Sequence, residues 1–257
     1  MSDSDPQVLR DLAPGGRLRA AINYGNPVLV QKHPATGQPQ GVSVDLANEL
    51  GHRLGVPVDL VTFDAAGKVF EALKTSSWEV AFLAIDPVRA REISFSAPYV
   101  IIEGTYLVRK ESPLRSIADF DRHGVRIAVG RGAAYDLFLA RFLQQAELVR
   151  ADTSMTALEL FADQQLDAAA GVRQQLTAFA KGRPGLRVVE GRFTVIEQAM
   201  GTPRRCVAGA EYLAGFIEEM KASGFVASAL ARSGQHDAGV APPLSAQRGS
   251  HLGCQRT

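Results

Sequence analysis

The chain has 257 residues, with 28 lysines and arginines against 27 aspartates and glutamates, so its formal net charge is +1. A near-neutral chain lacks the basic surface that displaces counterions from phosphates, which argues against nucleic-acid binding. Hydrophobic residues make up 46% of the chain, enough for a buried core and too many for a disordered protein. No segment approaches about eighteen consecutive apolar residues, so no membrane-spanning helix is predicted.

The N-terminal residues MSDSDPQ are polar and acidic. They have neither the basic nor the apolar region of a signal peptide, so the sequence predicts a cytoplasmic chain or one whose leader lies outside this sequence. Its two cysteines and five histidines show no ligand spacing, and we therefore expect no metal, no cofactor and no disulfide framework.

Strand-like apolar runs alternate with segments of helical periodicity from residue 18 onward. The first such elements are strands at 18–22, 59–63 and 80–85 and helices at 44–54 and 68–73. Parallel strands need long crossover connections, usually helices, so this alternation predicts an α/β fold with mainly parallel sheets.

The same alternation resumes after residue 110. Its predicted strands and helices, in chain order, are 125–129, 133–144, 147–151, 156–163, 168–172, 176–181 and 186–189. Two more helices, 211–220 and 225–232, are separated by Ser223 and Gly224, a typical helix stop. The segment 236–257 is rich in Gly, Ser, Pro and Gln, which predicts a disordered tail.

Two segments repeat one pattern. Residues 71–83 align without gaps on 159–171, and each has a helix end, a polar turn, a large apolar residue, an acid and a buried strand. Any helix–turn–strand unit shows such a pattern, so the alignment alone leaves open whether the chain contains two similar halves.

Residues 85–99, IDPVRAREISFSAPY, follow a predicted strand with an arginine, an acid and the pairs Phe-Ser and Pro-Tyr at set spacing. The segments QGVSVDLANEL at 40–50, VRIAVGRG at 125–132 and QLDAAA at 165–170 complete an ordered series of motifs. This series resembles the family-3 periplasmic solute-binding proteins, the amino-acid-binding components of ABC importers. The resemblance covers about residues 16–232.

The resemblance implies a two-lobe, type II periplasmic-binding-protein-like fold. In such proteins two mainly parallel sheets are joined by two crossing strands, and the ligand lies between the lobes. Lobe one would be residues 1–105 plus 197–235 and lobe two 106–196, followed by the tail 236–257. The crossings would lie near 104–108 and 198–203.

Arg89 occupies the position at which the resembled family binds the ligand's α-carboxylate. A guanidinium suits that role because its planar fork donates two parallel hydrogen bonds. The turn that contains Gly132 and Ala133 would place backbone N–H groups at a helix N-terminus, where an anion binds; the alternative is a plain strand-to-helix turn. Arg131 and Tyr135 would reach the ligand from the same loop.

Two positions depart from the family pattern. Ala84 stands where relatives often carry Ser or Thr, and Val172 stands where amino-acid binders carry an Asp for the α-ammonium, with Arg173 next to it. The carboxylate side of the site is therefore kept while the amine side is lost. We expect a small carboxylate or other anion, or an amino acid whose amine is held elsewhere, with Glu103 as the candidate; a local salt bridge is the alternative for Glu103.

Three further candidates, Tyr24, Asn26 and Phe63, lie on loops that relatives use for the ligand's side chain. An alternative interpretation makes them ordinary turn and core residues.

The resulting hypothesis is a monomeric substrate-binding component of an ABC importer. Its partners would be a small anion or amino acid and an ABC permease, with no nucleic acid, and the resemblance implies a periplasmic location. No catalytic motif is present, so no catalytic residue is assigned. The alternatives are a cytoplasmic small-acid sensor and a dehydratase-like enzyme on the same scaffold, whose general acid would be Glu103 or Asp64.

Overall fold

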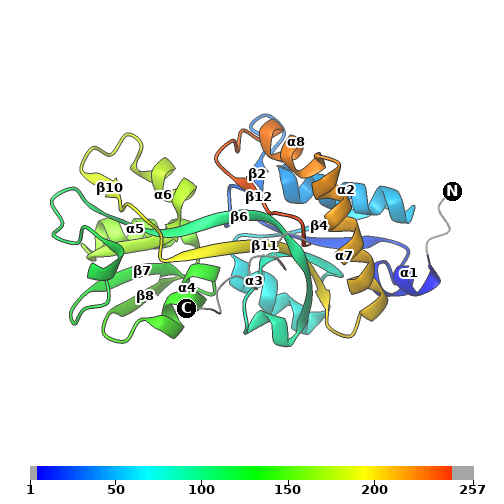
Figure 1. The fold of residues 1–257 in the computed structure, drawn as a ribbon, viewed down its shortest axis with the longest axis horizontal. Coiled ribbons are helices and arrows are strands. Elements are labelled where there is room, and N and C mark those ends of the chain that lie inside the picture. The colour runs from blue at the N-terminus through cyan, green and yellow to red at the C-terminus, as the bar shows by residue number, and fades with distance from the viewer. Residues whose placement is uncertain (1–4, 245–257) are drawn as a thin grey trace, which may run out of the picture.

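Two groups of helices and strands lie at opposite ends of the long axis of the molecule in the computed structural model (Figure 1), which describes residues 5–244. Two long strands, β6 (Ile93–Arg109) and β11 (Thr194–Pro203), run between the groups and pair with each other in antiparallel fashion. We call the group that contains the N-terminus the first lobe and the other the second lobe.

One continuous path of hydrogen-bonded strands runs through both lobes, in the order β4-β1-β5-β11-β6-β9-β7-β8. Each lobe contributes three parallel strands. They are β1 (Leu18–Asn23), β4 (Val58–Phe63) and β5 (Val80–Ala84) in the first lobe, and β7 (Arg126–Gly130), β8 (Glu147–Ala151) and β9 (Ala168–Val172) in the second. Two sheets are predicted from the sequence; they are continuous here because β5 pairs with β11 and β9 pairs with β6.

Four short strands complete the pairing. β10 (Leu186–Val188) and β12 (Gly239–Val240) both pair with β6, while β2 (Gln31–Lys32) and β3 (Pro39–Gln40) form a separate ladder.

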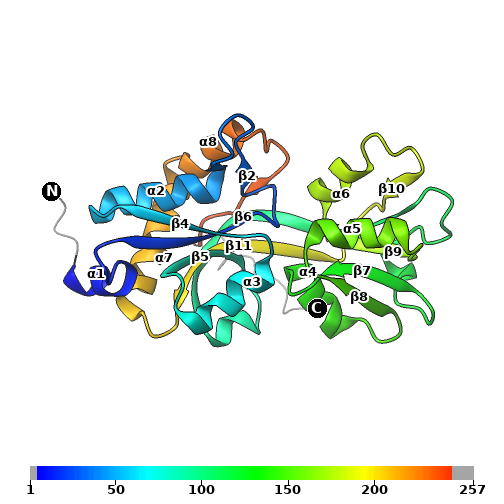
Figure 2. The ribbon, with the colours of Figure 1, turned by 180° about the vertical axis from the view of Figure 1, so that it is seen from behind.

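Helices flank the strands of each lobe (Figures 1 and 2). Those of the first lobe are α1 (Pro6–Leu12), α2 (Val42–Leu54), α3 (Ala66–Glu71), α7 (Val207–Ala222) and α8 (Phe225–Arg232); those of the second are α4 (Ala134–Phe142), α5 (Ser154–Asp163) and α6 (Arg173–Ala180). Three short 3₁₀ helices are η1 (Ala72–Thr75), η2 (Arg89–Arg91) and η3 (Ile117–Asp119). Within residues 5–244, no helix is long and apolar enough to cross a membrane.

The helix ends follow from local sequence. Helix α2 ends at Gly55, whose φ of 68° lies in the left-handed region that glycine adopts most readily. Helix α5 begins at Thr153, which forms a capping box with Thr156. Between α7 and α8, Gly224 has a φ of 76°, as the predicted helix stop requires.

The repeated pattern of the sequence has the same structure in both lobes. Glu79 accepts a hydrogen bond from the backbone N–H of Arg19 in β1, and Asp167 accepts one from the backbone N–H of Arg126 in β7. The backbone N–H of each acid donates in return to the carbonyl of the same arginine. This shared hydrogen bonding supports two lobes of similar architecture.

The predicted strands and helices of residues 18–232 are confirmed, with ends that shift by a few residues. The alternation pattern missed helix α1 and the full length of β6 and β11. In the predicted disordered tail, Gly239–Val240 forms β12, and buried Ala241 donates its N–H to the carbonyl of Tyr99. This part of the tail therefore differs from the expectation, and residues 245–257 lie outside the described residues.

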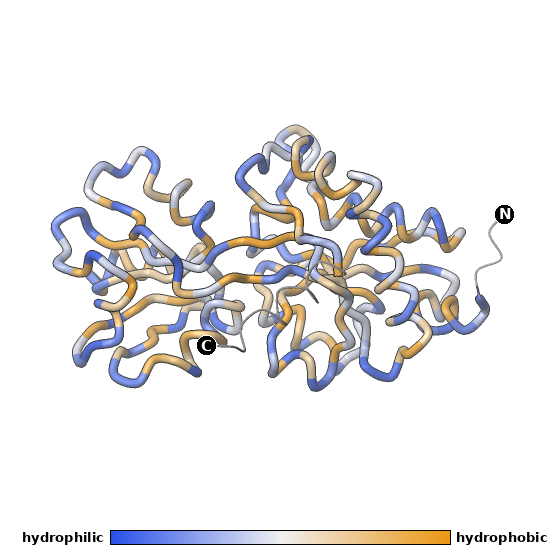
Figure 3. The backbone as a smooth tube through the Cα atoms, viewed as in Figure 1, coloured by the Kyte–Doolittle hydropathy of each residue, from blue (hydrophilic) through white to orange (hydrophobic). Residues whose placement is uncertain are grey.

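Hydrophobic segments follow the strands, including much of the two crossing strands, whereas hydrophilic segments lie mainly in the outer loops (Figure 3). Trp78, the single tryptophan, is fully buried in the first lobe against Val69, Leu83 and Ile93. Its indole N–H donates to the carbonyl of Val69 at 2.9 Å, so the ring is fixed both by packing and by a hydrogen bond.

Replacement of Trp78 by Phe removes the buried indole donor and leaves part of its volume empty. We expect Trp78→Phe to lower the free energy of unfolding by about 2–4 kcal/mol, measured by urea denaturation with far-UV circular dichroism. Val207→Ala, at a side chain that is 64% exposed, is the control and is expected to change it by less than about 0.5 kcal/mol. Equal effects of the two substitutions would contradict this account of the core.

Candidate functional site

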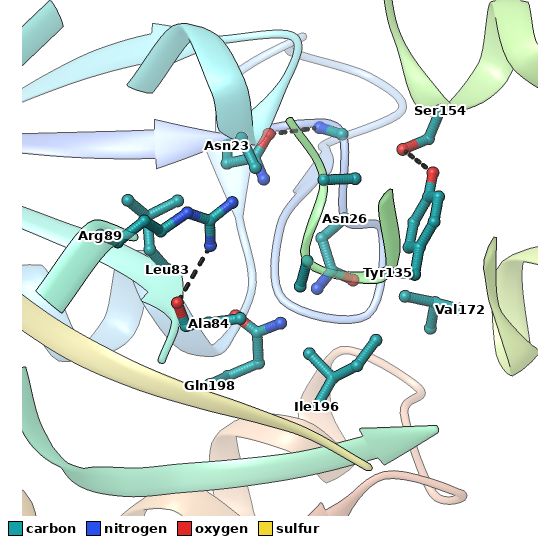
Figure 4. A pocket seen from close by; sticks show the side chains of 14 residues that line it. Asn23, Asn26, Leu83, Ala84, Arg89, Tyr135, Ser154, Val172, Ile196 and Gln198 are labelled. Atoms are coloured by element: carbon teal, nitrogen blue, oxygen red, sulfur yellow. Dashed lines mark hydrogen bonds between the residues drawn. The ribbon is translucent and has the colours of Figure 1, made fainter. Parts of the chain in front are cut away.

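A small cavity lies between the two lobes, at the carboxyl ends of strands from both (Figure 4). Asn23 ends β1, Ala84 ends β5, Val172 ends β9, and Ala133 follows β7. Ligands of α/β proteins typically bind at this edge of the strands. We call the cavity the central pocket; its lining residues are Asn23, Gly25, Asn26, Ala66, Leu83, Ala84, Arg89, Ala133, Ala134, Tyr135, Ser154, Val172, Ile196 and Gln198.

Among residues 5–244, Arg89 is the only charged residue that lines the central pocket. It comes from η2, just after β5, and is only 1% exposed. One terminal nitrogen, Nη1, donates to the carbonyl of Ala84 at 3.0 Å, and the other, Nη2, donates across the gap to the carbonyl of Gly132 at 2.8 Å. Its Nε is buried without a hydrogen-bond partner. Burial lowers the pKa of Arg89 to about 10, so the group is still a cation at neutral pH.

Two buried asparagines at the end of β1 point amide groups toward the same space. Asn23 Oδ1 accepts the backbone N–H of Gly25 at 2.9 Å, and Asn26 Oδ1 accepts that of Val28 at 3.2 Å. These contacts fix which side of each amide is oxygen. Both NH₂ groups therefore face away from these turns, and among the described contacts neither donates to a protein acceptor.

The second lobe contributes a hydroxyl pair and an apolar wall. Tyr135 donates its hydroxyl to Oγ of Ser154 at 2.8 Å, and burial raises the pKa of Tyr135 to about 12, so the phenol stays neutral. Val172 lines the pocket beside them, and from the crossing strand β11 come Ile196 and Gln198. Figure 4 shows the side chains of Gln198 and Ile196 on the side of the pocket opposite Asn23.

The backbone donors of the glycine-containing turn differ from the expectation. The N–H groups of Arg131 and Ala133 donate to the carbonyls of Ala151 and Gly130, and that of Gly132 donates to Asp136 Oδ2. These three N–H groups are thus used within the second lobe. In the first turn of α4, the described contacts give no acceptor for the N–H groups of Ala134, Tyr135 and Asp136.

Three other predicted residues lie outside the lining of the central pocket. Arg131 is exposed, and its carbonyl faces Gly67 of the first lobe. The Tyr24 ring lies under the ammonium of Lys32 at 5.2 Å, and Phe63 packs against the cluster around Trp78. Tyr24 and Phe63 thus match the alternative interpretation as turn and core residues.

The structure also places Glu103 and Arg173 outside the central pocket. Glu103, on β6, accepts from Arg173 at 2.8 Å and from Arg192 at 2.6 Å. Hydrogen bonds from Arg192 and then Arg173 lower the pKa of the Glu103 carboxyl. Both oxygens are engaged, so the local salt-bridge alternative describes Glu103 in this structure.

Several lining residues were not assigned from the sequence, notably Asn23, Ser154 and Gln198. Asn23 follows an apolar run directly, which is a signal for a strand-end side chain. Ser154 and Gln198 gave no local signal, because only the packing of α5 and β11 against the other lobe brings them to the pocket. Among the residues that the structure describes, no group of His, Cys, Asp and Glu side chains is arranged to hold a metal ion.

The two lobes touch at several points around the central pocket. Besides the bond from Arg89 to the Gly132 carbonyl, Arg141 of α4 forms an ion pair with buried Asp86 at 2.8 Å. Helices α3 and α4 lie on either side of the gap between the lobes (Figure 2). The central pocket has a volume of about 30 Å³, which is room for roughly two water molecules. The lobes must therefore separate to admit a solute.

Gly67 lies at a close backbone contact across this gap, against Arg131 and Gly132. A Cβ added at Gly67 would lie 2.9 Å from the carbonyl oxygen of Arg131, which is closer than such atoms approach. Gly67 lies in α3 and has ordinary helical dihedral angles, because it is absent from the residues of positive φ. Alanine there suits the helix better than glycine does but obstructs the contact between lobes.

We therefore expect Gly67→Ala to weaken ligand affinity at least tenfold while leaving the melting temperature of the ligand-free protein unchanged or raised. Isothermal titration calorimetry and thermal unfolding measure the two effects. The matched control is Gly215→Ala in α7, where nothing lies within 4 Å of an added Cβ. Unchanged affinity of Gly67→Ala would show that this contact has no part in binding.

Glu103 gives a pH-dependent prediction. The pKa of Glu103 is lower in the folded state than in the unfolded state. The carboxylate therefore stabilises the fold fully at pH values above its unfolded pKa of about 4.3. This stabilisation is lost as the pH falls through the pKa of the folded state. Glu103→Gln should thus lower the melting temperature at pH 7, and the deficit should shrink below about pH 4. Exposed Glu92, which has no ion pair among the described residues, provides the control Glu92→Gln, with no expected change. An equal deficit at both pH values would contradict the assignment.

Comparison with known families and proteins gives consistent results. The family model described as bacterial extracellular solute-binding proteins, family 3, matches residues 18–233. The chain is 20% identical over 201 residues to a glutamine-binding protein of Geobacillus stearothermophilus, covering 77% of this chain and 76% of that protein. It is 31% identical over 140 residues to the virulence sensor protein BvgS of Bordetella bronchiseptica, covering 54% of this chain and 11% of the sensor.

Among solved structures, the chain is similar to a mutant of ArgBP from T. maritima, with a TM-score of 0.75 and 22% identity. The match covers 88% of this chain and 98% of that one. This similarity confirms the predicted fold class of two lobes joined by crossing strands.

Proposed function

Because the chain belongs to the bacterial extracellular solute-binding proteins of family 3, we propose that it binds a small carboxylate-bearing solute, an amino acid or an organic acid, in the central pocket. The observation that carries this proposal is the Arg89 guanidinium, which is buried and forms no ion pair with any residue among 5–244. A buried charge is costly unless an opposite charge offsets it. A bound carboxylate would supply that opposite charge.

The hydrogen bonds of Arg89 indicate how a carboxylate would bind. A bidentate contact needs two N–H groups on one edge of the guanidinium, and Nε with Nη2 form such an edge. Nε has no partner, while Nη2 donates to the carbonyl of Gly132 in the other lobe. We propose that the ligand's carboxylate takes the place of that carbonyl, with the lobes reclosing around the solute.

Opening and closing would be a hinge motion of the crossing strands. In this proposal the moving units are residues 1–105 plus 197–235 and residues 106–196. A ligand closes the lobes only to the extent that it makes more favourable contacts in the closed form than in the open one. Arg89 from the first lobe and Ala134 from the second are the candidates to make such contacts on opposite sides of the ligand.

Binding without catalysis is the activity proposed here. The two acids considered for a dehydratase are both engaged in ion pairs: Glu103 with Arg173 and Arg192, and Asp64 with Lys68 at 2.8 Å. A general acid in the pocket needs a carboxyl group that touches the substrate, and neither of these lines the pocket.

We propose that the protein acts outside the cytoplasmic membrane as the monomeric binding component of an ABC importer, delivering its solute to a permease. The family description and the match to a glutamine-binding protein over three quarters of both chains support this role.

A sensory role is the second candidate, and it is favoured by the 31% identity to the virulence sensor BvgS over 140 residues. Uptake of the radiolabelled solute by cells that lack the gene separates the two roles. Lost uptake identifies an importer component, and normal uptake with altered transcription identifies a sensor.

Arg89 provides the direct test of carboxylate binding. At a ligand concentration of about 100 Kd the wild-type protein gains about 2.7 kcal/mol, which corresponds to a rise in melting temperature of roughly 5–10 °C. We expect Arg89→Gln to abolish this rise in a screen of small carboxylates, while the ligand-free variant melts no lower, because it no longer buries an unpaired charge.

Exposed Arg91, two residues along the same 3₁₀ helix, provides the control, and Arg91→Ala should keep the full ligand-induced rise. Retention of the rise by Arg89→Gln would exclude Arg89 as the carboxylate-binding group.

A further inference from the structure

We infer that the central pocket selects short monocarboxylates without an ammonium group, such as 2-hydroxy and 2-oxo acids, over the corresponding amino acids. This inference rests on the proposed function, because it specifies the ligand class of the same pocket.

The charge of the central pocket favours a ligand with one negative charge. Among its 14 lining residues, Arg89 is the only charged one, and none is a carboxylate. A bound monocarboxylate brings the buried charge to zero. A zwitterionic amino acid leaves a net charge of +1 among the lining residues. It also places its ammonium near the Arg89 guanidinium in a lining that contains no carboxylate, which disfavours binding.

Four acids on the segments around the pocket are already engaged. Asp86 binds Arg141 and the backbone N–H of Val88, and Asp136 binds Arg150 and the backbone N–H of Gly132. Glu103 and Asp64 are held by the arginines and the lysine named above. An ammonium would have to break one of these pairs to find a carboxylate.

The pocket contains hydrogen-bond donors that have no partner among the described residues. The NH₂ groups of Asn23 and Asn26 face it because their oxygens accept backbone N–H groups, and Arg89 adds Nε. The side-chain acceptors are neutral, namely the amide oxygen of Gln198 and the hydroxyl oxygens of Ser154 and Tyr135. An ammonium has donors only, whereas a hydroxyl or oxo oxygen accepts. The pocket thus complements an oxygen at the second carbon of the ligand better than a nitrogen.

The volume of the pocket favours a short ligand. The space of about 30 Å³ is smaller than any of these ligands, so the lobes must reclose farther apart around each of them, and a shorter ligand requires the smaller displacement. Leu83, Val172 and Ile196 present apolar surface to this space, which suits a methyl group or a small aliphatic chain.

Matched ligand pairs test the inference directly. Isothermal titration calorimetry with the full chain would compare L-lactate and pyruvate with L-alanine, and L-2-hydroxyisocaproate with L-leucine. In each comparison the carbon skeleton and the carboxylate are the same, and only the group on the second carbon differs. We expect the oxygen-bearing acid to bind at least tenfold more tightly than its amino acid, and lactate or pyruvate to bind more tightly than the longer acid.

The outcomes separate this inference from the proposed function. Equal or tighter binding of the amino acids overturns the inference and leaves carboxylate binding intact. Tighter binding of the longer acid overturns the part of the inference that concerns length. An absence of binding by every acid and amino acid in a wider panel, or undiminished binding of the acids by Arg89→Gln, overturns both.

A substitution at Val172 tests the physical cause. Val172 lines the pocket and is the N-cap residue of α6, with extended backbone angles and no side-chain cap. Asp and Asn are among the preferred N-cap residues, so Val172→Asp and Val172→Asn should both fold. Only Val172→Asp adds a charge. We expect it to bind alanine at least tenfold more tightly than Val172→Asn does and to lose affinity for lactate. Equal alanine binding by the two variants would show that the missing carboxylate is not what excludes the amine.

Discussion

The antiparallel pairing of β6 with β11 is the constraint on which both lobes depend. The parallel strands of the first lobe attach to it through β5 and those of the second through β9. The remaining contacts between the lobes are side chains and turns, such as the Arg141–Asp86 pair and the approach of Gly67 to Arg131. A continuous backbone ladder is harder to break than these contacts. In the proposed hinge motion, the crossing strands would therefore stay paired and bend while the other contacts separate.

The same arrangement buries the Arg89 guanidinium at the boundary between the two lobes. Arg89 extends from the first lobe, and its last hydrogen bond is to a carbonyl of the second lobe. Its charge is not balanced by any carboxylate that lines the pocket, and its burial depends on the other lobe. Under the proposed function, this one side chain would couple occupancy of the pocket to the position of the lobes, which suits both a transport component and a sensor.

Sequence patterns predicted the fold well, because its elements have clear periodicity and end at residues with local preferences, as Gly224 and Thr153 show. The motif around Arg89 also predicted a residue that lies in the central pocket. The assignments that differ from the structure depend on competition between partners. Glu103 and the N–H of Gly132 have suitable chemistry to bind a ligand. In the structure, however, Glu103 accepts hydrogen bonds from two arginines, and the Gly132 N–H donates to Asp136. A local sequence pattern does not show which groups will pair in this way.

The sequence alone determined the α/β class, the order of the main strands and helices between residues 18 and 232, and the presence of an arginine shortly after β5. Tertiary structure decided which polar groups remain without partners: the NH₂ groups of Asn23 and Asn26, the side chain of Gln198 and Nε of Arg89. The physical reason is that secondary structure follows from interactions within a few residues, whereas the polarity of a pocket is what remains after all long-range hydrogen bonds and ion pairs have formed.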